Sequence, residues 1–390
     1  MPAPVNSPST PPAASDGPLR LGVIGCGKVF ERLHLPAISR SSDVRLVSVC
    51  EPDPSRRTWA TEVVPDAGAF ADVETLLTES ELHAVLVCTP PASHAGIALI
   101  ALERGLHVLS EKPLATSSAD ARAIVTAARH SNRTVVVGFN RRFRRTYQAL
   151  RARLADSGEA KCHLRYVFQA DSDRWNRART EVGSESGTAG SDADGILSDV
   201  ASHQLDLVPW IAGRDVESVR ARVGSPEIGG RAVTIDVRLE GGIEAELHAG
   251  YGRGYSERLE VPLPDRRLVA YPGVLLDPRW IGASLVGGQR FSAVVERGVA
   301  RVSEAGGHLL RRAVGRPGLT LESVDRQLSC FAARVRAAPP EVHNPAVAAE
   351  GVPRWLEDGA DERDGMRCAA AVEACLSSLA TAGRWELVQP

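Results

Sequence analysis

A series of short apolar runs divides the first 140 residues of the chain into repeating segments. These runs are residues 19–27, 43–53, 82–91, 105–113 and 133–140. Near-continuous, β-branched runs of this length are typical of strands buried on both faces of a parallel sheet. Between them, residues 94–104 and 118–130 carry apolar side chains at helical spacing, with Ser118 as the expected N-cap of the second segment. The alternation predicts an α/β protein that begins with a doubly wound domain.

The pattern changes beyond residue 154. Four segments then alternate apolar with polar side chains, at residues 161–171, 216–224, 231–242 and 243–251. A period of two predicts strands of an open antiparallel sheet with one covered face. Residues 171–195 are rich in Gly, Ser and Asp and predict a loop, whereas 196–213 and 362–383 predict amphipathic helices. Residues 252–345 have a mixed pattern that assigns neither helix nor strand.

The length of 390 residues exceeds one ordinary hydrophobic core and indicates two domains. We predict a disordered tail over residues 1–18, because this segment is dominated by Pro, Ala and Ser and lacks the basic and apolar regions of a signal peptide. Residues 19–140 then form a Rossmann dinucleotide-binding domain. Residues 141–390 form an α/β domain for substrate binding and oligomerisation.

Composition and charge argue against several classes of protein. The formal net charge is -2, so nothing indicates a nucleic acid or a membrane surface as partner. No apolar run approaches the ~18 residues that span a bilayer. The seven cysteines form no CxxC pair and have no regular spacing, so we expect neither a disulfide framework nor a metal site. These features predict a cytoplasmic protein.

The first apolar run ends in the sequence GCGKVF, which places Gly25 and Gly27 directly after a strand and before a helix. Glycine permits a tight turn and a close approach to a pyrophosphate, whose charge then lies at the helix N-terminus. Phe30 occupies the last position of the GxGxxG pattern, so the fingerprint is incomplete. An ordinary strand-to-helix turn is the alternative interpretation.

The second run ends in Glu51, 26 residues after Gly25, close to the expected place of an acid that binds ribose hydroxyls. A carboxylate at that place repels a 2′-phosphate, so Glu51 favours NAD as the cofactor. Arg56 and Arg57 follow closely and could offset this preference, which leaves NADP as the alternative.

Four segments together resemble the glucose-fructose oxidoreductase / inositol dehydrogenase (Gfo/Idh/MocA) family. They are GVIGCGKV, VLVCTPPASHAGIALIALERGLHVLSEKPLA, VVVGFNRRF and GILSDVASHQLDLVPWIAG. The resemblance implies an N-terminal Rossmann domain and a C-terminal α/β domain with a large, mostly antiparallel sheet. It also implies hydride transfer between a nicotinamide and a hydroxyl-bearing carbon of a sugar, cyclitol or nucleotide-sugar, in a homodimer or homotetramer.

The resemblance implies that Lys112, Asp199 and His203 carry the reaction and contact the substrate. Lys112 is one of only three lysines among the 46 basic residues of the chain. An ammonium is a compact donor, unlike the planar guanidinium, so a lysine retained here suits a site next to a reacting hydroxyl. Imidazole suits a general base, and residues four apart on a helix share one face. Ala201 departs from the family pattern, in which glycine is common.

Several assignments remain open at this stage. Asp206 follows His203 by three residues and could orient it, which would leave Asp199 to the substrate. Trp175 could stack on a sugar ring or serve as a core or rim residue. Arg141, Arg142, Arg144 and Arg145 are interpreted as a solvated or interface surface, with a substrate phosphate as the alternative. The candidate cofactor-binding residues are Gly25, Gly27, Lys28, Val29, Glu51, Thr89, Pro90, His94, Glu111, Lys112 and Asn140.

Two other functions stay in view. A nicotinamide-binding regulator without turnover would need less of the Lys112, Asp199 and His203 set. A reductase of a non-sugar carbonyl, an imine or a tetrapyrrole would keep the fold and change the substrate.

Overall fold

The computed structural model describes residues 17–157, 163–171, 192–229, 231–264, 266–272, 274–276, 319–337 and 358–390. The chain divides into two compact units. The first unit comprises residues 1–138 and 324–366, and the second comprises 139–323 and 367–390. Most of the predicted tail, most of the predicted loop over 171–195 and Trp175 lie outside the described residues.

The first unit is built on a six-stranded parallel sheet with the order β3-β2-β1-β4-β5-β6. This is the strand order of a Rossmann fold and confirms the predicted doubly wound domain. The strands are β1 (Leu19–Ile24), β2 (Val44–Cys50), β3 (Gly68–Phe70), β4 (Ala84–Val87), β5 (His107–Ser110) and β6 (Val135–Val137). The sequence did not predict β3, because a strand of three residues is too short to show a period.

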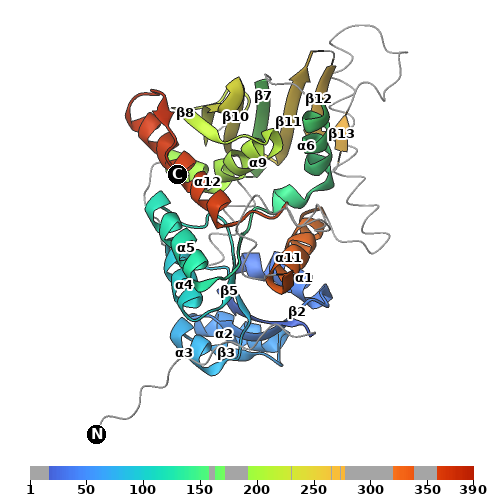
Figure 1. The fold of residues 1–390 in the computed structure, drawn as a ribbon, viewed down its shortest axis with the longest axis vertical. Coiled ribbons are helices and arrows are strands. Elements are labelled where there is room, and N and C mark those ends of the chain that lie inside the picture. Colours follow the sequence, from blue (N-terminus) through green and yellow to red (C-terminus); the bar gives the residue numbers. More distant parts are fainter. Residues whose placement is uncertain are drawn as a thin grey trace. The chain divides into compact units, whose positions relative to one another are not determined.

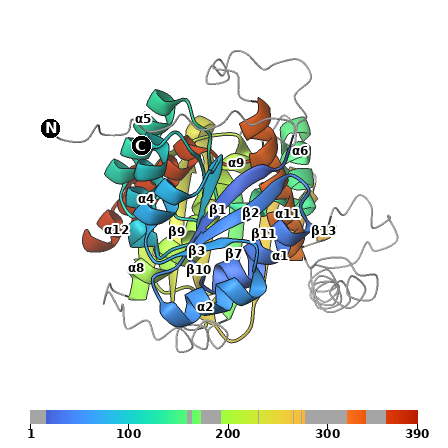
Figure 2. The same ribbon diagram turned by 90° about the horizontal axis from the view of Figure 1, so that it is seen from below.

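Helices cover both faces of this sheet. The helical segments are η1 (Phe30–His34), α1 (Leu35–Arg40), α2 (Pro54–Val63), α3 (Val73–Glu79), α4 (Pro91–Glu103), α5 (Ser118–Ser131) and α11 (Leu319–Ala337), whose first residues belong to the second unit. Helices α4 and α5 lie on one side of the sheet, and α1 and α11 lie on the other (Figures 1 and 2). The N-cap of α5 is Ser117 rather than Ser118, since the Ser117 side chain accepts the amide hydrogen of Asp120.

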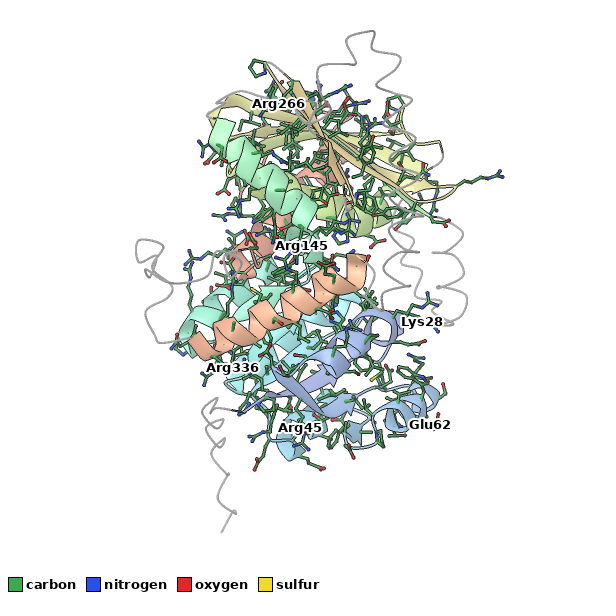
Figure 3. All side chains as sticks on the ribbon, turned by 90° about the vertical axis from the view of Figure 1, so that its right-hand side faces the viewer. Lys28, Arg45, Glu62, Arg145, Arg266 and Arg336 are labelled. Carbon is green, nitrogen blue, oxygen red and sulfur yellow. The ribbon has the colours of Figure 1, made fainter. Side chains whose placement is uncertain are left out.

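Helix α11 contributes to the core of the first unit although it is distant in sequence. Val324, Leu328 and Phe331 are buried in the same cluster as residues of β1 and α1. Arg336, which Figure 3 labels near the end of α11, lies 3.0 Å from the Asp43 carboxylate. Residues 324–366 therefore group with the first unit, whereas the sequence analysis assigned everything beyond 140 to the second domain. A pattern confined to neighbouring residues does not show where a distant helix packs.

The second unit is built on an eight-stranded sheet with the order β13-β12-β11-β7-β10-β9-β8-β14. Only β7 and β10 pair in parallel, so the sheet is mostly antiparallel, as predicted. The strands are β7 (His163–Asp171), β8 (Val216–Val223), β9 (Arg231–Leu239), β10 (Ile243–Gly252), β11 (Ser256–Leu263), β12 (Arg266–Tyr271), β13 (Val274–Leu276) and β14 (Glu386–Leu387).

Helices α6 and α9 pack on one face of this sheet (Figure 1). The helical segments are η2 (Asn140–Phe143), α6 (Arg145–Ser157), α8 (Asp192–Ile196), η3 (Leu197–Ala201), α9 (Ser202–Ala212), η4 (Glu240–Gly242) and α12 (Glu362–Ala380), whose first residues belong to the first unit. Residues 192–195, predicted as loop, are helical, because α8 continues directly into η3 and α9. Gly213 ends α9 with a positive φ of 65°, as predicted.

None of the helices in the part of the chain that the structure describes is long and apolar enough to cross a membrane.

Candidate active site

The turn after β1 requires glycine at position 25. Gly25 has φ of 94°, and a Cβ atom there would lie 2.7 Å from the Cys88 carbonyl oxygen at the end of β4. Gly27 differs, because a Cβ atom there would meet nothing within 4 Å. The helix that follows begins at Lys28, so its N-terminal amides lie next to Gly27 in the chain. The turn can therefore accept a pyrophosphate beside Gly27.

Phe30, the departure from the glycine fingerprint, begins the π-helical turn η1. Its side chain is fully buried and packs edge-on against Trp59, with ring centroids 6.3 Å apart. Beside it, Val29 is 42% exposed and Lys28 pairs with Glu31 at 3.5 Å. Figure 3 labels Lys28 on this first helix. Both predicted cofactor residues thus lie next to the glycine turn.

Glu51 is half-buried at the end of β2, and two backbone amides fix its carboxylate. The Cys26 amide donates to Oε2 at 2.8 Å, and the Asp53 amide donates to Oε1 at 3.1 Å. A carboxylate offers about four acceptor positions, so two remain for other donors. This group fits the hydroxyls of a ribose diol next to the glycine turn.

The two arginines that could have favoured NADP are held by the chain itself. Arg56 donates to the Cys26 carbonyl and to Glu31, and its guanidinium lies 4.1 Å above the Trp59 ring. Arg57 donates to the carbonyl oxygens of Glu51 and Pro52 at 2.6 and 3.0 Å. Both guanidinium groups thus donate to acceptors within the protein, which supports NAD rather than NADP as the cofactor.

Lys112 lies in the turn after β5, within the first unit. The Glu111 carboxylate beside it accepts the Lys112 amide hydrogen at 3.1 Å and contacts Nε2 of the buried His34 at 2.7 Å. Burial alone would raise the pKa of Glu111, but the bond and charge of His34, with the charge of Lys112, hold this pKa below its usual value. The Lys112–Pro113 peptide bond is cis. Both carboxylate oxygens of Glu111 therefore have partners in the protein.

Four further candidate residues remain, and three of them lie near the ends of β4 and β5. Thr89 and Pro90 follow β4, and Pro90 is the N-cap of α4. His94 is buried, and its ring nitrogens lie 2.7 Å from the carbonyl oxygens of Thr89 and Pro113. His94 thus connects the ends of two strands, and its contact with the cofactor stays a prediction. Asn140 opens η2 in the second unit and is half-buried.

The second unit holds Asp199 and His203. Asp199 lies in the π-helical turn η3, and His203 lies in the first turn of α9. Both are half-buried among neighbours that are mostly buried. The Tyr251 hydroxyl donates to Asp199 at 2.6 Å, and the Phe168 ring meets the His203 ring edge-on at 6.2 Å between centroids. Tyr251 and Phe168 are neighbours of the site that the sequence analysis missed.

Asp206 is engaged by an arginine. It is buried, and the Arg142 guanidinium donates hydrogen bonds to both oxygens of its carboxylate, with Nε 3.1 Å from Oδ2. This two-pronged ion pair satisfies the charge of Asp206 inside the protein. It favours Asp199 over Asp206 as the acid that acts with His203.

The arginine run is not a solvated surface, which corrects the sequence interpretation. Arg141, Arg142 and Arg144 are all buried, and only Arg145 is largely exposed (Figure 3). Their burial is possible because buried carboxylates pair with them. Arg144 donates to Glu257 at 2.8 Å, and Arg141 lies 3.4 Å from the same carboxylate.

Glu257 is the centre of a buried polar group in the second unit. We call the Glu257 cluster the set Arg141, Arg144, Tyr147, Tyr166, Tyr255 and Glu257. The hydroxyls of Tyr147 and Tyr166 donate to the carboxylate at 2.5 and 2.6 Å, and that of Tyr255 donates as well. Burial would raise the pKa of Glu257, but the two arginines and the tyrosine bonds hold it far below its usual value.

The Phe168 ring connects the Glu257 cluster to His203, the candidate base. The Arg141 guanidinium lies 3.9 Å above the centre of the Phe168 ring, and Phe168 contacts both His203 and Tyr255 edge-on. Among the residues described here, no three metal-ligating side chains come together as a metal site.

Comparisons with known proteins agree with this architecture. Residues 19–139 match the family described as "Oxidoreductase family, NAD-binding Rossmann fold". Residues 164–266 match the Gfo/Idh/MocA C-terminal domain. The inositol 2-dehydrogenase of Corynebacterium glutamicum (strain R) is 31% identical over 255 residues, which are 62% of this chain and 70% of that protein.

Two solved structures have the same fold. The myo-inositol 2-dehydrogenase of Lactobacillus plantarum has a TM-score of 0.67 at 18% identity, covering 95% of this chain and 100% of that one. The scyllo-inositol dehydrogenase of Lactobacillus casei, solved with bound NAD(H) and scyllo-inositol, has a TM-score of 0.67 at 16% identity, covering 95% and 99%.

A Rossmann unit joined to a unit with a mostly antiparallel sheet is the architecture of a two-domain nicotinamide-dependent dehydrogenase. The chain belongs to the Gfo/Idh/MocA family of oxidoreductases, which confirms the resemblance drawn from its motifs.

Proposed function

We propose that this protein is an NAD-dependent dehydrogenase that moves hydride between nicotinamide and a secondary hydroxyl carbon of a cyclitol or sugar. The observation that carries the proposal is the Glu51 carboxylate, fixed by the amides of Cys26 and Asp53 beside an open glycine turn. It supplies what the adenosine ribose of NAD requires and opposes the 2′-phosphate of NADP. The substrate class is supported by the inositol dehydrogenase of Corynebacterium glutamicum.

Each residue of the proposed set takes part in this reaction. Bound NAD supplies the hydride acceptor. His203 accepts the hydroxyl proton of the substrate as the carbonyl forms, because an imidazole near neutral pKa suits a general base. Asp199 binds a substrate hydroxyl or stabilises the imidazolium, and Tyr251 holds its carboxylate in place. Lys112 donates to the reacting oxygen and stabilises its developing negative charge.

The remaining features of the assignment concern assembly and location. We infer a homodimer or homotetramer, because the family resemblance implies that the large sheet of the second unit forms an oligomer interface. A cytoplasmic location fits the cysteines within the described part of the chain, which are all free thiols.

The first test is a fluorescence titration of the purified protein with NADH and with NADPH, after a check for cofactor carried through purification. We expect NADH to bind at least tenfold more tightly. A panel of polyols that begins with myo-inositol is then assayed for NAD reduction. Tighter binding of NADPH would indicate NADP as the cofactor, with Arg56 and Arg57 in place of Glu51 as the residues that decide the preference. Binding of neither cofactor, with none retained, would contradict the proposed function.

A further inference from the structure

His94 contacts two backbone acceptors from inside the first unit. It lies in the first turns of α4 (Pro91–Glu103) and is 1% exposed. Its Nδ1 lies 2.7 Å from the Pro113 carbonyl oxygen, and its Nε2 lies 2.7 Å from the Thr89 carbonyl oxygen. One ring therefore joins the residue that follows Lys112 to the end of β4.

The hydrogen-bond inventory decides the chemical form of this ring. A backbone carbonyl oxygen only accepts, and a neutral imidazole carries a single N–H. With a neutral ring, one of the two short contacts would bring a nitrogen lone pair against an oxygen lone pair in a buried place. The imidazolium has two donors and satisfies both contacts, and such charge-assisted bonds are short and strong.

Two other buried histidines of the same unit show the opposite arrangement. His83 and His107 each accept a backbone N–H on Nδ1, from Arg20 and from Thr134, both at 3.0 Å. An accepting nitrogen carries no proton, so each of these rings needs only one N–H. Burial agrees with this, since it lowers the pKa of His107 to about 4 and also lowers that of His83. His94 is thus distinguished from them by its partners rather than by its burial.

The contacts of His94 complete a three-sided support for the Lys112 turn. His34 holds Glu111 on one side at 2.7 Å. Gly138 closes another side, because a Cβ atom there would lie 3.0 Å from the Lys112 amide nitrogen and 2.9 Å from the Glu111 carboxylate. His94 fixes the Pro113 carbonyl. A long lysine side chain reaches a reacting atom reproducibly only if its backbone is held in this way.

We propose that His94 is a positioning residue for Lys112, held as an imidazolium whose two N–H groups tie Pro113 to Thr89. The link to catalysis rests on the proposed role of Lys112, whereas the charged form of His94 rests only on the contacts of the ring. The two parts are therefore tested separately.

The first measurement is a two-bond ¹H–¹⁵N spectrum of the histidine rings of the full-length wild-type protein at neutral pH. We expect both ring nitrogens of His94 at protonated chemical shifts, with His83 and His107 as internal references for neutral rings. The His94→Gln variant identifies the His94 signals by their loss. A neutral tautomer pattern for His94 would overturn the proposal and would leave the dehydrogenase assignment intact.

The second measurement is a double-mutant cycle with the polyol that gives the highest turnover. We expect His94→Leu to lower kcat at least thirtyfold, and His94→Gln, which keeps an amide donor, to recover part of this loss. In the Lys112→Ala background, His94→Leu should lower kcat less than threefold further, because the residue it positions is already gone. Equal losses in both backgrounds would show a merely structural role and would contradict the proposal. An unaffected Lys112→Ala enzyme would instead contradict the proposed function.

Discussion

The nucleotide end of the first unit, which comprises Gly25, Gly27 and Glu51, and the Glu257 cluster of the second unit are held by different kinds of interaction. The first uses backbone: glycines at positions 25 and 27 clear space, and amides of Cys26 and Asp53 hold one carboxylate. The second uses side-chain charge: one buried carboxylate holds two arginines and three tyrosines. A backbone site tolerates changes to its surroundings but not to its glycines, whereas a charged interior depends on every partner.

This difference has an energetic consequence. A half-exposed carboxylate such as Glu51 can exchange its protein partners for water at little cost. A buried carboxylate such as Glu257 cannot, and the loss of one member leaves uncompensated charge inside the protein. The two regions should therefore respond differently to isosteric substitutions: cofactor affinity changes in the first, and folding stability changes in the second.

The largest effect should follow from Glu257→Gln. This change keeps the shape of the side chain but leaves Arg141 and Arg144 buried without their counter-charge. We expect the free energy of unfolding to fall by about 3–5 kcal/mol, measured by urea denaturation. The matched control is Glu244→Gln on β10, where the carboxylate is 54% exposed and lies 3.5 Å from Arg238. The control should cost less than about 1 kcal/mol. Equal losses would remove the distinction between the two regions.

The same carboxylate predicts acid sensitivity. The folded pKa of Glu257 lies far below its unfolded value, so its contribution to stability is present above the unfolded pKa and is lost as the pH falls. Wild-type protein should therefore lose stability between about pH 5 and pH 2 more steeply than Glu257→Gln does. Parallel curves would contradict the charge pairing.

The next effect separates the two glycines. Gly25→Ala places a Cβ atom against the end of β4 at a positive φ, so we expect a loss of about 2–4 kcal/mol in stability together with weak NADH binding. Gly27→Ala points into open space, so it should leave thermal unfolding unchanged and weaken only NADH binding. Full NADH affinity in Gly27→Ala would place the pyrophosphate elsewhere.

A third carboxylate, Glu362 in the first unit, sharpens the comparison because it is buried like Glu257 but has the opposite pKa shift. Burial, and then the charge of Asp361, raise the pKa of Glu362 to about 7. A raised folded pKa means that the stability is fully present below the unfolded value of 4.5 and is lost as the pH rises through 7. Glu362→Gln should stabilise the protein by about 2–3 kcal/mol at pH 8 and leave it unchanged at pH 4. Destabilisation at pH 8 would contradict this account.

The smallest effect concerns cofactor choice. Glu51→Gln replaces one acceptor oxygen by an NH₂ group and removes the charge, so we expect NADH affinity to fall about tenfold to thirtyfold, which is about 1.4–2 kcal/mol. The preference over NADPH should fall with it. Glu62→Gln makes the same chemical change on the exposed side of α2 (Figure 3) and should leave both affinities unchanged. Unchanged NADH binding in Glu51→Gln would contradict the proposal that Glu51 binds the ribose hydroxyls.

The nucleotide end could be proposed from the sequence because its signals are local. Gly25 and Gly27 lie in one turn, and Glu51 ends the next strand, so the order of strands in a parallel sheet brings them together. Arg56 and Arg57 were not decided by the sequence, since their internal partners, such as the Cys26 carbonyl, become visible only in three dimensions.

The Glu257 cluster was not predictable in the same way. Arg144 and Glu257 are 113 residues apart, and Tyr166 and Glu257 are 91 apart. One local signal did exist in β11. Leu259, Val261 and Leu263 are buried at alternate positions, and Glu257 continues that series two residues earlier. A carboxylate in the buried register of a strand requires buried cations, and the arginine run at 141–144 supplies them.

The catalytic role of Asp199 and His203 stays a prediction, but both residues were named in advance because they match a motif of the family that the sequence resembles. Tyr251 and Phe168 were not, since each appears as an ordinary aromatic residue in an alternating strand, and only the packing of β7 and β10 against η3 brings them to the site.

The most direct test of the whole account compares turnover and cofactor binding in the wild type, Lys112→Ala and Lys112→Arg. We expect Lys112→Ala to lower kcat at least a thousandfold while the dissociation constant of NADH stays within about threefold, because the fold of the Rossmann unit does not depend on the ammonium group. Lys112→Arg should also lose most of the turnover, since a planar guanidinium does not replace a compact donor. Wild-type turnover in either variant would contradict the role of Lys112 and with it the proposed chemistry.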